Sequence, residues 1–440
     1  MADKQSTKPP SGTRDFLPDE IRRREHVVGV IRGVYERHGF EPLETPAFEN
    51  IETLLGKYGE EGNKLIFKIL KRGEHEHTGE ADLGLRYDLT VPLARVVAQY
   101  QNEIPKFFKR YQIQPVWRAD RPAKGRFREF YQCDIDSIGS TSLVVEAEQL
   151  GAVSDVLQRL GFKDFMIRLN DRRLLTALME SFAIEPREYG NVLVAIDKLD
   201  KIGVEGVRQE LALRAVDQMA ANAMLRIFAA ESSDFDTIER MLGPKVLVGV
   251  REILRLSDDT PAAGRVRIDP SLARGLSYYT GAIMEVAVPD LAGSLGGGGR
   301  YDNLVGMFLG RDVPACGFSL GLERIIVVMT ERNMFPAEVA GSGVDVMVTI
   351  WSAEAQGDAV RLAAELRRGG LRVDVYPEAD KLAKQFKYAS TRNVPIVAVV
   401  GDDERARGEV AIKDMRSGDQ TSVPRAAAAA HITRALHPEP

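Results

Sequence analysis

The chain has little cysteine, no long apolar run and no excess of positive charge over its 440 residues. Its two cysteines, Cys133 and Cys316, have no CxxC spacing and cannot form a zinc site alone, so buried free thiols are expected. No apolar run approaches the roughly 20 residues that a membrane helix needs. The first ten residues (MADKQSTKPP) also lack the apolar core of a signal peptide. A soluble, cytoplasmic protein is therefore expected.

The charge balance excludes a protein coated in positive charge, because the formal net charge is −5. Binding of nucleic acid needs only a local basic surface, so composition leaves such a partner open and supplies no evidence for one. With 440 residues, of which 44% are apolar, the chain is long enough for two or three domains that each have a core.

The most informative stretch is residues 107–139, which predicts two strands joined by a basic loop. Alternate side chains of the second strand share a face, and the polar face would carry Arg126, Arg128, Phe130, Gln132, Asp134 and Asp136. The loop adds a group of cations typical of phosphate binding, namely Arg118, Arg121, Lys124 and Arg126. An isolated basic loop is as often a solvated hairpin tip. The carboxylates on the same face favour a floor that holds a polyphosphate beside a small polar molecule.

Three other segments carry candidate chemistry. In residues 85–92 (LRYDLTVP), Asp88 and Thr90 are two apart, which predicts that they share one strand face; the alternative is a pair that caps the following helix. Residues 315–329 predict a strand, a turn and a helix with Arg324 in its first turn, where the helix dipole favours anions. Residues 293–302 (GSLGGGGRYD) predict a glycine-rich turn that is not a Walker A loop.

Two polar clusters have simpler explanations. Residues 74–77 (EHEH) lack any metal-ligand spacing and are expected in an exposed loop, so no metal held by the protein is predicted. Lys381, Lys384 and Lys387 are expected on one helix, usually as a solvated face, with a phosphate-contacting stripe as the alternative. They lie within residues 344–415, where strands and helices alternate and predict an α/β domain with a largely parallel sheet.

Four segments resemble, in order, the motifs of one enzyme family. Residues 85–92 (LRYDLTVP), 117–136 (WRADRPAKGRFREFYQCDID), 273–281 (ARGLSYYTG) and 317–325 (GFSLGLERI) are similar to those of histidyl-tRNA synthetases, which are class II aminoacyl-tRNA synthetases. The matches spread over most of the chain, so the resemblance is specific. Two departures are Ser277, where the family usually has Asp, and Ala119, where a bulkier residue is common. Neither replaces a residue assigned to substrate, so they are expected to tune activity.

The resemblance implies an α+β class II catalytic domain, an antiparallel sheet flanked by helices, with a helical insertion and a C-terminal α/β anticodon-binding domain. The expected parts are a flexible N-terminus (1–10), the catalytic domain (11–170 and 259–332), the insertion (171–258), a linker (333–343) and the anticodon-binding domain (344–440). A helix within residues 19–39 and the extended segment that ends at Pro46 resemble the family's motif 1, which implies a homodimer.

The resemblance also implies a reaction. ATP, with Mg²⁺ bridging its phosphates, would activate L-histidine to histidyl-adenylate, and the histidyl group would pass to the 3′ end of tRNA(His). Histidine is expected at Asp88, Leu89, Thr90, Arg118, Gln132, Asp136, Arg274, Tyr278 and Tyr279. ATP is expected at Arg118, Asp120, Arg126 and Arg324. Arg118 and Arg274 are the expected catalytic residues, because they would neutralise the α-phosphate as charge shifts.

Selectivity for histidine has a physical explanation in this scheme. Neutral imidazole offers one hydrogen-bond donor and one acceptor, so Asp136 and Tyr279 could satisfy both ring nitrogens. Two alternatives remain. A regulatory subunit of ATP phosphoribosyltransferase typically lacks the C-terminal domain and part of the ARGLSYYTG segment, and this chain has both. A non-catalytic tRNA-binding module would not need the ATP-contacting arginines, which are all present.

Overall fold

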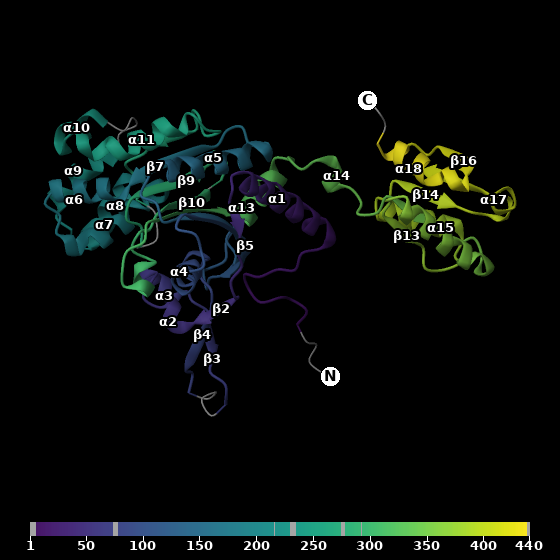
Figure 1. Cartoon of the computed structure of the whole chain (residues 1–440), viewed down its shortest axis with the longest axis horizontal. Helices are drawn as coiled ribbons and strands as arrows, with labels where there is room; N and C mark the ends of the chain where they lie inside the picture. Colours follow the sequence, from purple (N-terminus) through teal and green to yellow (C-terminus); the bar gives the residue numbers. More distant parts are fainter. Residues whose placement is uncertain are drawn as a thin grey trace. The chain divides into compact units, whose positions relative to one another are not determined.

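The computed structural model describes residues 6–73, 78–214, 216–228, 235–273, 278–291 and 293–437 (Figure 1). Residues 74–77, Arg274 and Ser277 therefore lie outside the described residues. The chain divides into two compact units, one of Met1–Asp15 with Arg24–Met334 and the other of Phe16–Arg23 with Phe335–Pro440. Among the described residues, no helix combines the length and the apolar character needed to cross a membrane.

The first unit is built on a sheet of eight strands in the order β1-β5-β6-β11-β10-β9-β7-β8. Their bounds are β1 Glu41–Pro42, β5 Phe108–Trp117, β6 Glu129–Ile138, β7 Met166–Asp171, β8 Val266–Ile268, β9 Ala282–Ala287, β10 Ser294–Arg300 and β11 Ala315–Gly321. The six central strands are antiparallel to their neighbours, and each edge adds one parallel pair, β1 with β5 and β8 with β7. The expected sheet flanked by helices is confirmed, although its edges make it mixed rather than purely antiparallel.

Long helices cover one face of this sheet and leave the other to polar side chains. The covering helices are α1 (Pro18–Arg37), α5 (Val144–Arg159) and α13 (Leu322–Glu331). The Tyr35 hydroxyl of α1 donates to the Cys133 carbonyl, and the Gln149 amide of α5 donates to the Cys316 carbonyl. Both cysteines are buried free thiols, as predicted. The opposite face is thus available for a polar site.

The predicted pair of strands in residues 107–139 is confirmed as the β5–β6 hairpin. Its register places Gln112 opposite Asp134 and Arg110 opposite Asp136. The second strand begins only at Glu129, so Arg126 and Arg128 precede it in the loop and are not part of the predicted strand face. The reason is that the loop closes on itself, with mutual backbone hydrogen bonds between Ala123 and Arg126.

The predicted glycine-rich turn of residues 293–302 is wrong, because Ser294–Arg300 forms strand β10 in the middle of the sheet. Added Cβ atoms at Gly296 and Gly298 would meet the carbonyl oxygens of Ser319 and Gly317 on the neighbouring strand β11. Glycine is therefore needed here for close approach of two strands, not for turning.

Smaller elements surround the polar face of the sheet. A three-stranded sheet, β2 (Phe48–Asn50), β4 (Ala81–Leu85) and β3 (Lys68–Leu70), lies with α2 (Ile51–Leu54), α3 (Gly59–Lys64) and α4 (Thr90–Gln99) (Figure 1). Near the C-terminal end of β10 lies the short helix α12 (Gly306–Leu309). The cluster of buried residues on this side includes Tyr58, Tyr87, Tyr278 and Tyr301. The polar site therefore has aromatic walls.

Helices fill the chain between β7 and β8. They are α6 (Arg172–Ser181), α7 (Tyr189–Ile196), α8 (Leu199–Leu213), α9 (Gln218–Phe228), α10 (Phe235–Leu242) and α11 (Val248–Ser257), and Figure 1 shows them gathered together beyond the β7 side of the sheet. Asp171 caps α6 by accepting from the backbone N–H of Arg173. The boundaries proposed for the insertion, 171–258, stay a prediction.

The second unit holds a five-stranded sheet in the order β13-β12-β14-β15-β16. The strands are β12 (Val346–Val348), β13 (Val373–Val375), β14 (Ile396–Val399), β15 (Glu409–Asp414) and β16 (Gln420–Pro424). The helices are α14 (Ala337–Ala340), α15 (Gln356–Arg368), α16 (Leu382–Thr391), α17 (Asp402–Arg407) and α18 (Ala428–Leu436). The expected α/β domain is present, but a largely parallel sheet is wrong. Only β13-β12-β14 is parallel, because the short connections after β14 and β15 return the chain antiparallel.

Candidate active site

Asp88 lies in a turn, not on a strand. Strand β4 ends at Leu85 and helix α4 begins at Thr90, so the predicted shared strand face of Asp88 and Thr90 is wrong. The Asp88 carboxylate instead accepts a hydrogen bond from the backbone N–H of Val91 (3.0 Å), although the N-cap of α4 is the next residue, Leu89. Asp88 thus contacts the first turn of α4 without being its N-cap, and its carboxylate still faces other side chains.

Two tyrosines complete the surroundings of Asp88. The hydroxyl of Tyr58 donates to Asp88 Oδ1 (3.0 Å) and that of Tyr278 donates to Oδ2 (3.2 Å). Burial raises the pKa of Asp88, while the Val91 N–H, the charge of Arg118 and the two hydroxyls act in the opposite direction. A carboxylate walled by aromatic rings suits a small cation such as an ammonium group. No motif pointed to Tyr58, which reaches the site only through the fold.

The other end of the site is a buried ion pair on the sheet. Arg110 Nη2 lies 2.7 Å from Asp136 Oδ2, and neither side chain is more than 2% exposed. The hydroxyl of Tyr301 donates to Asp136 Oδ1. Burial raises the pKa of Asp136, and the charge of Arg110 and the Tyr301 hydroxyl oppose that rise. Arg110 also donates to the Leu89 carbonyl and to Gln112 Oε1, both at 3.2 Å. The Leu89 side chain is buried, so only its backbone is within the site.

Arg118 and Gln132 are linked to each other and, through Gln132, to strand β11. Gln132 Nε2 donates to Ser319 Oγ (2.8 Å), and Arg118 Nη2 donates to Gln132 Oε1 (3.5 Å). Arg118 Nε donates to the Tyr87 carbonyl (3.0 Å), and its guanidinium lies 4.3 Å from the centre of the Tyr87 ring. The motif 2 arginine is therefore fixed at its Nε and stacked on a ring, next to the turn that carries Asp88.

Asp134 is a buried acid of this floor for which no ligand role is predicted. It pairs with Gln112 on one side and Ser319 on the other in the sheet register. Burial raises the pKa of Asp134 to about 7; the charge of Arg110 lowers the pKa and that of Asp136 raises it further. Its neighbour Tyr279 has a raised pKa through burial, and its hydroxyl has no hydrogen-bond partner among the residues that the structure describes. A free hydroxyl beside acids suits a polar ligand.

The predicted ATP residues form a separate cluster near the hairpin loop. Arg126 Nη2 donates to Asp120 Oδ1 (2.9 Å), so two predicted ATP contacts are paired with each other. Arg324 Nη1 donates to the Ser294 carbonyl (2.6 Å), and a Cβ at Gly125 of the loop would be 3.8 Å from Arg324. The loop and the first turn of α13 therefore meet, with cations from both. Arg324 is in that first turn, as predicted.

The two clusters are neighbours. The pKa of Tyr87 is raised mainly by burial, and it also responds to the charges of Arg118, Asp120, Asp88 and Arg126. An acid and aromatic pocket thus lies beside a cationic loop, with Arg118 between them. Arg274 cannot be placed, because it lies outside the described residues, and Ala119 only donates its backbone N–H to the Leu65 carbonyl.

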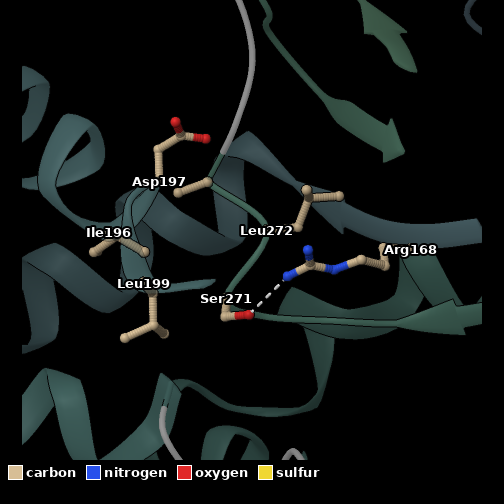
Figure 2. Close-up of a pocket in the computed structure, with 7 residues that line it drawn as sticks. Arg168, Ile196, Asp197, Leu199, Ser271 and Leu272 are labelled. Carbon is tan, nitrogen blue, oxygen red and sulfur yellow. Dashed lines mark hydrogen bonds between the residues drawn. The ribbon is translucent and has the colours of Figure 1, made fainter. Parts of the chain in front are cut away.

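Side chains of β7 anchor the segment that leads into residues 273–281. Arg168 Nε donates to Asp269 (2.7 Å) and its Nη2 donates to Ser271 Oγ (3.1 Å), as Figure 2 shows for Ser271. Asn170 Nδ2 donates to the carbonyls of Pro270 and Leu272. The cavity beside them, about 10 Å³, has room for about one water molecule and is not a substrate site. The segment before Arg274 is therefore held by the sheet itself.

This arrangement is that of an enzyme that holds an amino acid next to a nucleotide. A family model for histidyl-tRNA synthetase matches residues 12–325, and a model for an anticodon binding domain matches residues 345–434. Histidine–tRNA ligase of Porphyromonas gingivalis is 43% identical, over 95% of this chain and 97% of that protein. The ligase of Gloeobacter violaceus is 40% identical, over 95% of this chain and 96% of that protein. The chain belongs to the histidyl-tRNA synthetase family.

Solved structures agree with this family. The crystal structure of histidyl-tRNA synthetase from a Nostoc species aligns with a TM-score of 0.82 and 30% identity, covering 98% of this chain and 100% of that one. A Bacillus halodurans protein, described as an ATP phosphoribosyltransferase regulatory subunit/histidyl-tRNA synthetase, aligns with a TM-score of 0.72 over 91% of this chain and 99% of that one. At 20% identity that likeness concerns the fold alone, so the regulatory alternative is less supported than the ligase.

Proposed function

We propose that this chain attaches L-histidine to tRNA(His) in two steps, as an ATP-dependent aminoacyl-tRNA ligase. The histidine carboxylate attacks the α-phosphorus of ATP, which gives histidyl-adenylate and releases pyrophosphate. The histidyl group then passes to the 3′ end of the tRNA and releases AMP. The observation that carries this proposal is the sheet face on which a pocket of acids and tyrosines adjoins a loop of cations.

The protein supplies position and charge in this reaction, not a covalent nucleophile. Asp88, with the hydroxyls of Tyr58 and Tyr278, binds the α-ammonium group. Arg118 lies between the two clusters, where the α-phosphate and the attacking carboxylate meet. Arg274 remains the proposed second catalytic cation. Arg126 and Arg324 contact the outer phosphates, and Asp120 orients Arg126 in addition to its proposed place near the adenine.

Selectivity comes from the buried floor. The Asp136 carboxylate forms an ion pair with Arg110 and accepts from Tyr301, and further lone pairs of its two oxygens remain for an imidazole N–H. Tyr279 offers its free hydroxyl to the other ring nitrogen, while Gln132 and Thr90 line the path between them. An amino acid without this donor and acceptor would leave buried polar groups unsatisfied, at a cost of about 1–3 kcal/mol each.

Several further features belong to this proposal. Mg²⁺ accompanies ATP and is bound mainly by the phosphates. The cationic side chains of the loop contact the same phosphates. Residues 344–440 bind the anticodon region and residues 171–258 bind another part of the tRNA. The enzyme acts as a homodimer through the region of α1 and β1, and it acts in the cytoplasm.

An aminoacylation assay tests the proposed function. Purified full-length protein is incubated with ATP, Mg²⁺, total tRNA and each of the radiolabelled amino acids in turn. Acid-precipitable label is expected with histidine alone. If no amino acid is attached, or another is attached faster than histidine, the proposed function is wrong.

A further inference from the structure

We infer that Arg110 is a positioning residue that fixes the two ends of the histidine pocket relative to each other. This inference rests on the proposed function and assigns a role to a residue that lies outside the predicted substrate contacts. Arg110 joins the Asp136 carboxylate, at the imidazole end, to the backbone of the turn that carries Asp88, at the ammonium end.

The contacts of Arg110 are those of a bridge. It lies on β5 with no exposed surface, and its Nη2 group is shared between Asp136 Oδ2 at 2.7 Å and the Leu89 carbonyl at 3.2 Å. Leu89 stands between Asp88 and Thr90 in the chain. The Nη1 group of Arg110 donates to Gln112 Oε1 at 3.2 Å, and this bond holds the guanidinium plane along the sheet. A planar group with several fixed donors can serve both ends at once, whereas a single ammonium cannot.

Arg86 provides an internal comparison, because its side chain is equally buried in the same unit. Its guanidinium donates to the carbonyls of Thr45 (2.7 Å), Pro46 (3.1 Å) and Pro115 (2.8 Å) and to Gln114 Oε1 (2.9 Å). These groups are all uncharged and belong to the framework. Arg110 instead contacts a site acid directly, because it forms an ion pair with Asp136 at 2.7 Å. The two arginines are equally buried, but Arg86 binds uncharged framework groups and Arg110 binds a site acid.

The charge of Arg110 also decides whether Asp136, in the floor of the pocket, is ionised. Three buried acids, Asp88, Asp134 and Asp136, lie close enough to influence one another, and Arg110 is the cation in contact with Asp136. A buried carboxylate without a partner takes up a proton. A protonated Asp136 would keep one oxygen as an acceptor but lose the charge that attracts an imidazole N–H. The bridge therefore maintains both the spacing and the charge of the pocket.

The spacing matters because histidine has a fixed length between its ammonium and imidazole groups. A shift of about 1 Å in an active site can cost about 10²-fold in rate. If the turn of Asp88 moves away from the floor, one end of histidine binds at the expense of the other. The proposed ATP contacts Arg126 and Arg324 bond to other groups, Asp120 and the Ser294 carbonyl, so ATP binding is expected to stay nearly unchanged.

The test compares Arg110→Lys with the matched control Arg86→Lys in histidine-dependent ATP–pyrophosphate exchange by the full-length protein. Both variants keep a positive charge and lose the planar fork. For Arg110→Lys we expect the KM for histidine to rise about tenfold or more, with the KM for ATP within about twofold. For Arg86→Lys we expect a lower Tm and both KM values within about twofold. Equal changes in both KM values in Arg110→Lys, or a histidine KM that rises as much in Arg86→Lys, would overturn the inference.

A milder pair covers the case in which Arg110→Lys does not fold. Gln112→Met removes the contact to Arg110 Nη1, and Gln149→Met removes a buried amide contact of α5 to the Cys316 carbonyl. Gln112→Met should raise the histidine KM about threefold and Gln149→Met should not; equal values for the two contradict a bridging role. The unmodified protein distinguishes failure of the proposed function from failure of the bridging role. Absence of histidine-dependent exchange there refutes the proposed function, whereas normal exchange with unaffected Arg110 and Gln112 variants refutes the bridge alone.

Discussion

The site has a buried end, the cluster around Asp88, Asp136 and Arg110, and an open end, the cationic loop. These two parts differ in burial and therefore in how much of their geometry exists before a substrate binds. Asp136 and Arg110 are at most 2% exposed and are held by partners on several strands. Arg126 and Lys124 of the loop are 55% and 75% exposed and have one carboxylate partner each. Interactions in the buried end are strengthened by low dielectric, whereas those of the loop are screened by water. In the proposed function, selection of the amino acid thus belongs to the buried end and neutralisation of phosphate to the open end.

This difference also explains how both substrates can share one sheet face. The buried end is already held in place by Arg110, Tyr58, Tyr278 and Tyr301, so it needs little reorganisation when histidine enters. The loop end offers charges on flexible side chains that can follow a triphosphate. Variants in the two regions should therefore affect different substrates.

The largest effect is expected when the buried end is broken. Asp136→Asn keeps the shape of the side chain, but it removes the charge that faces Arg110 and the imidazole. The histidine KM in pyrophosphate exchange should rise about 10- to 100-fold, because a charged hydrogen bond is replaced by a neutral one. The ATP KM should change less than about threefold. An equal rise for both substrates contradicts the assignment of Asp136 to the amino acid.

A smaller effect, on the other substrate, is expected at the loop end. Arg324→Ala removes a cation from the first turn of α13 and should raise the ATP KM about tenfold while leaving the histidine KM nearly unchanged. Arg159→Ala of helix α5 serves as the control, because its half-exposed ion pair with Asp155 lies outside the loop and contributes about 0–1 kcal/mol to stability. If the histidine KM responds to Arg324→Ala as strongly as the ATP KM does, the two ends are not separate.

The smallest effect concerns stability against pH and sharpens the description of the buried end. The pKa of Asp134 is raised to about 7 in the folded protein, so the folded state binds this proton more tightly than the unfolded state does. Its contribution to the free energy of unfolding therefore falls as pH rises from about 4 to about 7. Asp134→Asn should lose less stability than the unmodified protein between pH 5 and pH 8, measured as the urea midpoint. Parallel pH profiles for the two proteins contradict the raised pKa.

Local sequence patterns were sufficient to predict those residues that lie in a segment with its own alternation or motif. Alternation predicted the β5–β6 hairpin and the common face of Gln132, Asp134 and Asp136, and the helix after Gly321 predicted the place of Arg324. The family motifs added Asp88 and Tyr278, which the structure joins by a hydrogen bond. These residues were found because each lies in a segment with its own signal.

The remaining features depend on which strands become neighbours. Arg110 stands in β5 like any charged strand residue, and only the pairing with β6 brings it to Asp136. Tyr58 and Tyr301 were not among the predicted site residues, because they meet their acids only through tertiary packing. The local sequence predicts a turn for the glycines of β10, because it does not show that β11 passes so close. Residues proposed to contact the ligand were thus easier to predict than the residues that hold those side chains in place.

Direct binding of histidine in the absence of ATP tests the division of the site most simply. Calorimetric titration of histidine should give a Kd that rises at least about tenfold, or ~1.4 kcal/mol, in Asp136→Asn and by less than about twofold in Arg324→Ala. That result would place amino-acid recognition in the buried end before any nucleotide arrives. Equal Kd values for the two variants, or a larger loss in Arg324→Ala, would contradict it.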